Sequence, residues 1–189
     1  MIYICIPTTP ERNERTKQLV QSIHENTQNV EHCVVIFPNN LGGWVPAVHK
    51  MLEGINGYVV LLGSDVIVHK DWLKTLSEAF FKAFPNGDGV AEPFNELQGE
   101  QLCQHPMAHS ETIKKYLDKR LVHWYSDNLF TLLAQRDGKL IYVPDAKIEH
   151  KHFVNGKAEM DETYKTIFNP VTVEKDRLTF IELIKEYGF

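Results

Sequence analysis

The chain has 189 residues, a formal net charge of -5 and a hydrophobic content of 43%. A chain of this length buries about 70% of its unfolded surface in one domain, so it needs no disulfide to fold. Charges of both signs are interspersed along the sequence, which argues against a broad electrostatic grip on nucleic acid and leaves only a local basic groove open. Small-molecule or saccharide partners fit this composition better.

The cysteines and the first residues indicate a compartment. Cys5, Cys33 and Cys103 are odd in number and show no paired spacing, and two of them lie within apolar, strand-like runs. This pattern is typical of reduced thiols, so we expect a cytoplasmic protein. The segment 1–7 lacks a basic leader and is too short to span a membrane, so we expect it to form a core strand.

Strand-like and helix-like patterns alternate through the first half of the chain. Short apolar runs predict strands at 2–6, 33–37 and 58–62. Each run is followed by apolar residues at helical spacing: Leu19, Val20 and Ile23; Val45, Val48, Leu52 and Ile55; Trp72, Leu76, Phe80 and Phe84. The alternation predicts an α/β fold with a largely parallel sheet, helices on both faces, and ligands at the carboxyl ends of the strands.

The second half is less regular, and residues 90–104 carry few signals. We expect Ser110 to cap a short helix, and Gly138 to end a helix striped by leucines with a left-handed residue. Strands are predicted at 140–143 and 145–152, and a last helix follows Pro170. The polar stretch 155–166 is interpreted as a surface loop, with a lid over a bound ligand as the alternative. One domain over residues 1–170, with residues 171–189 packed on it as a helix, is the simplest organisation.

Gly63-Ser64-Asp65 places a carboxylate directly after the strand at 58–62. Apolar residues resume at once, so the acid is held at an edge between buried segments and is well placed to bind a metal. The alternative is a turn in which Gly63 permits an unusual backbone angle while Ser64 and Asp65 bond to local amides. Thr8 and Asn39 also follow strand ends, so one pocket could collect them with Asp65.

Four stretches resemble, in order and spacing, the motifs of family 2-like glycosyltransferases with the GT-A fold. Residues 4–12 are similar to the opening strand and donor loop, and residues 58–68 with Asp71-Trp72-Leu73 to the strand that carries the D-x-D metal motif. Ser126-Asp127-Asn128-Leu129 stands where the family places an acidic pair containing the catalytic base, and residues 143–150 resemble a late strand ending in a metal-binding histidine. The resemblance therefore implies a single-domain GT-A, Rossmann-like mixed sheet.

The resemblance also implies an enzyme that moves one sugar from a nucleotide-sugar donor to an acceptor hydroxyl with inversion. Asp127 would be the base, and Asp65 with His150 would hold a divalent cation, Mn or Mg. The residues implied for donor binding are Thr8, Thr9, Glu11, Arg12, Asn39, Ser64 and Asp65.

Each of these roles has an alternative. Ser126 or Asp127 could cap the helix, and Glu11 and Arg12 could form exposed salt bridges. His152 shares a strand face with His150, so either histidine could be the ligand.

The chain departs from the family pattern at three places. Gly63 replaces the first carboxylate of D-x-D, Ser126 replaces one of the acidic pair, and Asn39-Asn40 stands where the family often has a uracil-binding aspartate. The resemblance therefore leaves the donor base open. The membrane helices and the Q-x-x-R-W motif of processive synthases are absent, which favours a soluble enzyme that adds one sugar.

Two other functions remain. The missing carboxylates favour a non-catalytic nucleotide- or glycan-binding module on a degenerate GT-A scaffold. A nucleotidyltransferase would need a glycine-rich triphosphate loop after the first strand, and residues 7–12 contain no glycine. The acceptor is open between a saccharide, another hydroxyl compound and a nucleic acid.

Overall fold

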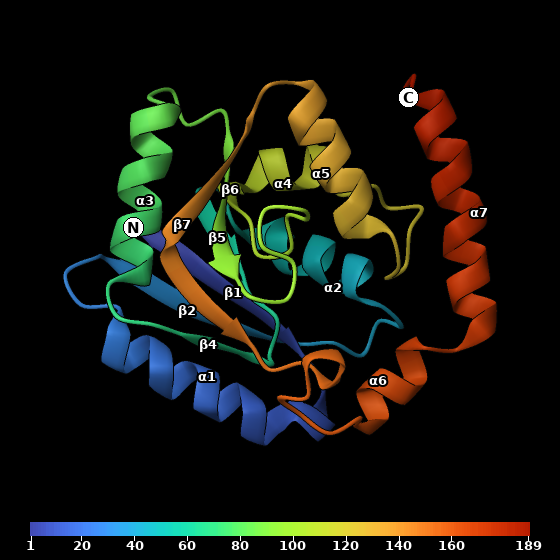
Figure 1. Cartoon of the computed structure of the whole chain (residues 1–189), viewed down its shortest axis with the longest axis horizontal. Helices are drawn as coiled ribbons and strands as arrows, with labels where there is room; N and C mark the ends of the chain where they lie inside the picture. Colours follow the sequence, from blue (N-terminus) through green and yellow to red (C-terminus); the bar gives the residue numbers. More distant parts are fainter.

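The computed structural model describes all 189 residues and is built on one seven-stranded sheet of order β2-β1-β3-β6-β5-β7-β4 (Figure 1). The strands are β1 (Ile2–Thr8), β2 (His32–Pro38), β3 (Tyr58–Leu61), β4 (Val66–Val68), β5 (Val90–Asn95), β6 (Met107–His109) and β7 (Leu140–His150). The helices are α1 (Asn13–Asn26), α2 (Trp44–Met51), α3 (Trp72–Ala83), α4 (Ser110–Tyr116), α5 (Ser126–Arg136), α6 (Glu162–Ile167) and α7 (Pro170–Glu186). Short 3-10 turns lie at η1 (Pro10–Arg12), η2 (Leu52–Gly54) and η3 (Phe153–Asn155).

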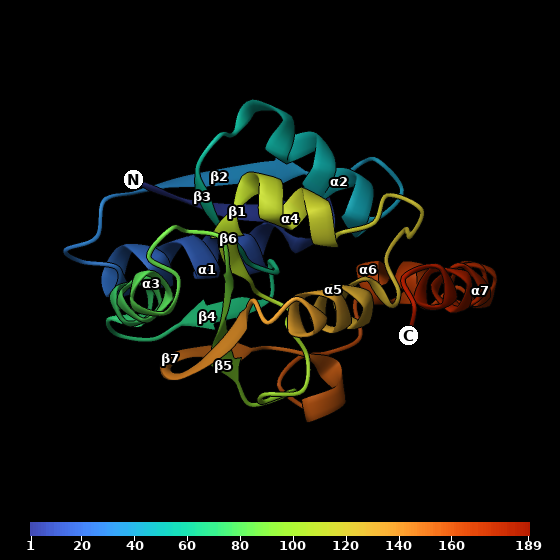
Figure 2. The ribbon, with the colours of Figure 1, turned by 90° about the horizontal axis from the view of Figure 1, so that it is seen from above.

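Helices cover both faces of the sheet, which confirms the predicted α/β, Rossmann-like class. Figure 2 shows α2 on one side of β1 and β2, and α1 on the other. One buried cluster joins the sheet to α2, α4, α5 and α7, and a second joins it to α1 and α3. The apolar stripes predicted along the sequence supply these clusters, because each helix turns its stripe toward the sheet.

The sheet is mixed, and its parallel part positions the polar residues that follow the strands. β1 pairs in parallel with β2 and with β3, and β5 pairs in parallel with β7, whereas β6 and β4 pair antiparallel to their neighbours. The carboxyl ends of β1, β2 and β3 therefore meet at one edge. There the backbone N–H of Asn39 donates to the carbonyl oxygen of Thr8 at 2.6 Å.

Residues 140–150 form one long strand, where the sequence predicted two strands. The register between β5 and β7 shifts, so that Val143 is opposite Pro93 and Lys147 is opposite Phe94. Pro144 has no N–H for the ladder, and the strand passes it as an irregularity rather than ending. The break that suggested two strands is therefore a local bulge.

One helix start also differs from the prediction. Ser110 is the first residue of α4, and the cap is His109, whose Nδ1 accepts from the N–H of Glu111 at 3.4 Å. The predicted end of α5 is confirmed, because Gly138 has a φ of 64°. None of the helices combines the length and apolar composition that crossing a membrane needs.

A buried carboxylate on α7 holds the segment that leads into α5. Asp176 is 0% exposed and accepts the backbone N–H groups of Val122, His123 and Trp124 at 2.8 to 3.0 Å. Leu183 on the same helix is also fully buried. This carboxylate therefore ties α7 to the start of α5.

We predict that Asp176→Ala lowers the free energy of unfolding by about 3 kcal/mol, because buried N–H groups lose their acceptor. Urea denaturation measures the change. Glu174→Ala is the control, because Glu174 is exposed on the same helix and pairs only with Arg177, so its loss should cost under about 0.5 kcal/mol. Equal stabilities of the two variants would contradict this role of Asp176.

Candidate functional site

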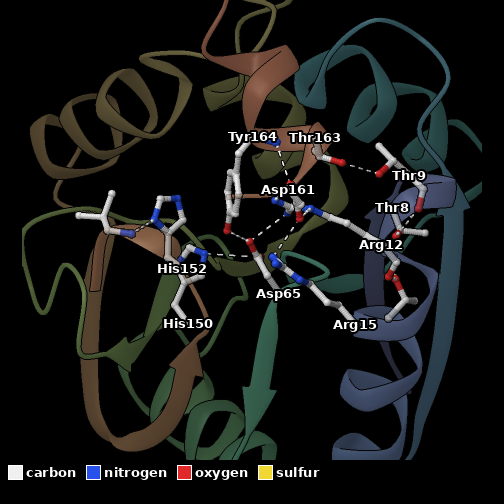
Figure 3. A network of polar contacts seen from close by, with 12 residues as sticks. Thr8, Thr9, Arg12, Arg15, Asp65, His150, His152, Asp161, Thr163 and Tyr164 are labelled. Atoms are coloured by element: carbon white, nitrogen blue, oxygen red, sulfur yellow. Dashed lines mark hydrogen bonds and ion pairs between the residues drawn. The ribbon is translucent and has the colours of Figure 1, made fainter. Parts of the chain in front are cut away.

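The carboxylate of Asp65 is the centre of a buried polar cluster at the edge where β1 and β3 end (Figure 3). Its Oδ2 accepts from Arg12 Nη1 at 3.0 Å and from the hydroxyl of Tyr164 at 2.5 Å. Its Oδ1 lies 3.4 Å from His150 Nε2. Side chains from η1, the β3–β4 turn, β7 and α6 thus meet at one carboxylate.

The surroundings of Asp65 determine its charge. Burial by itself raises the pKa of this carboxyl, but the hydrogen bond and charge of His150, then the charge of Arg12 and the hydroxyl of Tyr164, outweigh burial. Together they hold the pKa of Asp65 well below its usual range. Asp65 is therefore an anion at neutral pH.

Gly63 leaves room for this cluster. A Cβ added at position 63 would lie 2.7 Å from Asp65 Oδ1 and 3.7 Å from Cε1 of His105. The proposed unusual backbone angle is not the reason for the glycine, because Gly63 is not among the residues with positive φ. A carboxylate side chain at position 63 would therefore clash with Asp65 Oδ1.

Asp65 Oδ1 and His150 Nε2 suit neighbouring positions around one cation. Their separation of 3.4 Å is compatible with two ligands that each lie about 2.1 Å from a shared ion. No group of three or more His, Cys, Asp or Glu side chains is arranged to hold a metal ion. A cation at this point would therefore need further oxygen ligands from a bound molecule or water.

His105 lies beside the cluster and was missed in the sequence. It is 3% exposed, its ring centre is 5.2 Å from that of His150, and neither of its ring nitrogens has a hydrogen-bond partner. Burial, followed by the charge of His150, lowers the pKa of His105 to about 3, so its ring is neutral. It follows a stretch with few signals, and no periodicity marks it.

His152, the alternative ligand, lies next to His150, with ring centres 5.3 Å apart. Its Nδ1 accepts from the N–H of Val154 at 3.2 Å, and burial, then the charge of His150, lowers its pKa to about 4. His150, not His152, is the histidine in contact with Asp65.

Asp127 lies in the first turn of α5 and accepts from Gln104 Nε2 at 3.3 Å and from the N–H of Asn128 at 2.9 Å. Burial raises the pKa of its carboxyl. The helix cap is Tyr125 and has no side-chain cap hydrogen bond, while Ser126 donates to the carbonyl oxygen of His123. Neither Ser126 nor Asp127 is therefore the N-cap residue, but the carboxylate of Asp127 does satisfy one N–H of the first turn.

A second buried carboxylate, Glu92 on β5, links Asp127 to the Asp65 cluster. It is 0% exposed and accepts from the N–H groups of Gln104 and His105 at 2.9 to 3.0 Å and from Cys103 Sγ at 3.3 Å. Burial raises the pKa of Glu92 to about 8 in spite of these donors. Glu92 therefore fixes the backbone of Gln104, whose side chain contacts Asp127, and of His105, whose ring lies next to that of His150.

The other predicted donor residues lie around this edge. Thr8 Oγ1 contacts Thr16 Oγ1 at 2.7 Å, and Asn39 Oδ1 is buried without a partner. Ser64 is buried next to Asp65. The exposed salt-bridge alternative is wrong for both residues it concerned, because Arg12 is buried in its ion pairs and Glu11 is exposed without one.

The polar stretch 155–166 is not a loop over its whole length. It contains most of α6, and it contacts the cluster through Asp161 with Arg12 and Arg15, Thr163 with Thr9, and Tyr164 with Asp65. Its polar composition suggested a surface loop, whereas the side chains of Asp161, Thr163 and Tyr164 bind to residues of the first 65 positions. The surface-loop prediction is therefore wrong for residues 161–166, whereas residues 156–160 lie in no helix or strand and are mostly exposed.

No protein-family model and no curated protein matches this chain. The fold is similar to two crystal structures of TarS from S. aureus. The structure of TarS 1-349 has a TM-score of 0.57 and 15% identity, over 78% of this chain and 59% of that chain. A second TarS structure has a TM-score of 0.57 and 13% identity, over 100% of this chain and 44% of that one. The chain thus spans about half the length of these TarS chains, and the likeness is one of fold.

The titration of the buried groups predicts a stability maximum in pH. The pKa values of His105, His123 and His152 are lowered to between about 3 and 4, so the unfolded chain binds more protons below pH 6.5 and stability rises toward that pH. The pKa of Glu92 is raised to about 8, so its proton is lost more readily on unfolding, and stability falls between pH 6.5 and 8.

We predict that Glu92→Gln removes most of that fall, which amounts to about 2 kcal/mol over this interval. Urea unfolding at a series of pH values measures it. Glu100→Gln, at an exposed residue without an ion pair, should keep the wild-type slope. An unchanged slope above pH 6.5 in Glu92→Gln would exclude Glu92 as its source.

Proposed function

We propose that this chain is a metal-dependent, inverting glycosyltransferase that moves one sugar from a nucleotide-sugar donor to an acceptor hydroxyl. Its fold is similar to that of TarS, a glycosyltransferase. The observation that carries the proposal is that Arg12 and His150 both contact the carboxylate of Asp65. These residues come from three of the stretches that resemble glycosyltransferase motifs, and they lie where ligands bind in such sheets.

The donor half of the site would neutralise a departing diphosphate. Arg12 would bind phosphate oxygens through its planar guanidinium. A divalent cation, Mn or Mg, held by Asp65 and His150 would supply Lewis-acid stabilisation of the charge on the leaving group. The other proposed donor contacts come from Thr8, Thr9, Glu11, Asn39 and Ser64, and the unpaired Oδ1 of Asn39 can accept from an amino or imino group of a base.

Asp127 is the proposed base for the acceptor hydroxyl. Its raised pKa makes its carboxylate a better proton acceptor than an ordinary surface aspartate. Gln104 holds Oδ2 at 3.3 Å, which orients the carboxyl group. Proton removal as the hydroxyl attacks the sugar from the side opposite the leaving diphosphate gives inversion in one displacement.

One observation favours a second candidate, a nucleotide- or glycan-binding module without turnover. The chain offers only two side-chain ligands to a cation, and one of them, Asp65, is paired with Arg12. Calorimetry with a panel of nucleotide sugars separates the candidates, because binding without turnover across acceptors would support the module.

We predict that Asp127→Asn lowers kcat by 10² to 10⁴ with little change in donor affinity, because it removes the base and keeps the shape. Asp65→Asn should weaken binding of Mn and of the donor together. Release of nucleoside diphosphate in the presence of Mn measures turnover. Asp145→Asn, at an exposed strand residue outside the site, is the control. Full activity of both site variants would contradict the roles assigned to them.

A further inference from the structure

We propose that Arg12 and Arg15 form the binding site for the donor diphosphate, and that the chain's own Asp161 fills this site in the present conformation. The identity of the ligand rests on the proposed function. The site itself rests on the contacts of Asp161 in Figure 3.

Arg12 holds Asp161 with two nitrogens, as an arginine holds a phosphate, and Arg15 adds an ion pair. Arg12 contacts it twice, from Nε to Oδ2 at 3.1 Å and from Nη2 to Oδ1 at 3.4 Å. Arg15 Nη1 lies 3.1 Å from Oδ2. A guanidinium that grips a carboxylate with two nitrogens presents the same fork to a phosphate group, so a phosphate can take the place of Asp161.

The position is right for a diphosphate that also touches a cation. Arg12 reaches Asp65 through Nη1 and Asp161 through Nε and Nη2, so one guanidinium lies between the proposed cation ligand and the anion site. A phosphate at the place of Asp161 therefore lies beside Asp65. A donor bound there would have its phosphates within reach of the Arg12 guanidinium and of a cation at Asp65.

The ion pairs of the two arginines show which internal group the donor would replace. Asp161 is the only acidic partner of Arg15, whereas Arg12 keeps Asp65 when Asp161 moves away. Departure of Asp161 therefore exposes a net positive site, which a diphosphate complements. Tyr164, one turn further along α6, must move with it, because its hydroxyl occupies Asp65 Oδ2 and its ring lies 4.2 Å from the Arg12 guanidinium.

The competing explanation is that Asp161 is a structural brace. It caps α6, since its Oδ1 accepts from the N–H of Tyr164 at 2.8 Å. The substitution Asp161→Asn separates the two explanations, because asparagine caps a helix as well as aspartate does and has no negative charge. A brace predicts no gain in anion affinity, whereas an occupied anion site predicts one.

Titration calorimetry with inorganic pyrophosphate alone tests the proposal without assuming a base or sugar. Asp161→Asn should bind pyrophosphate at least about tenfold more tightly than the wild type, since the competing internal anion is gone. Adding Arg15→Gln to Asp161→Asn should remove most of that gain. Glu162→Gln is the matched control, because it removes the same charge from the neighbouring residue of α6, which pairs only with Lys165.

Tyr164→Phe provides a second variant that leaves Asp161 intact. It removes the hydroxyl that holds α6 to Asp65 and keeps the aromatic ring, so pyrophosphate should bind more tightly by a smaller factor. This variant keeps the proposal testable if Asp161→Asn folds poorly.

Trp124 reports the release of α6 directly. Its Nε1 donates to the carbonyl oxygen of Ile167 at 2.6 Å, and its ring centre lies 4.7 Å from that of Phe168. Pyrophosphate should change the tryptophan fluorescence of the wild type, and Trp124→Phe should abolish the change.

Equal pyrophosphate affinities of wild type and Asp161→Asn, or an equal gain in Glu162→Gln, would overturn the proposal. So would the absence of pyrophosphate binding in every variant. The outcome is separable from that of the proposed function: exchange at the arginines without sugar transfer from any donor refutes the function alone, and sugar transfer without a gain in Asp161→Asn refutes the anion site alone.

Discussion

The buried ion pair between Arg12 and Asp65 is the interaction on which the rest of the site depends. The two side chains are 9% and 5% exposed, so neither charge is stable in its place without the other. The pair also needs its remaining hydrogen-bonding groups satisfied, and Tyr164, Asp161 and His150 do this from α6, its cap and β7. Segments that are distant in sequence are therefore held at one edge of the sheet by a single electrostatic requirement.

The same requirement connects stability with binding. A site for a diphosphate and a cation must present both positive groups and a carboxylate, and in the absence of ligands those charges have to neutralise one another. Arg12 with Asp65, and Arg15 with Asp161, form such a set, with two positive and two negative side chains. On the proposal above, binding consists of an exchange of partners rather than the filling of an empty pocket, and its cost is the loss of the internal ion pairs.

Much of the fold followed from periodic patterns, and little of the site did. The strands β1 to β3 and the helices between them have regular apolar spacing, and residues just past their ends, such as Asp65, could be placed at one edge. Glu92 and His105 could not, because a single buried polar residue leaves no periodic signal and its partners lie far along the chain. The surface-loop prediction for 155–166 failed for a related reason, since Asp161, Thr163 and Tyr164 bind to residues far away in the sequence and no pattern marks them among exposed polar neighbours.

The glycine at position 63 and the partners of Asp65 belong to one arrangement. With Oδ2 held by Arg12 and Tyr164, the other oxygen, Oδ1, lies where a side chain at 63 would begin, 2.7 Å from its Cβ. An acid at 63 is therefore incompatible with this placement of Asp65. On the proposed exchange, Tyr164 leaves Oδ2, which then keeps Arg12 as its partner. A second acid is therefore absent from the turn, because the present conformation has no space for one beside Asp65 Oδ1.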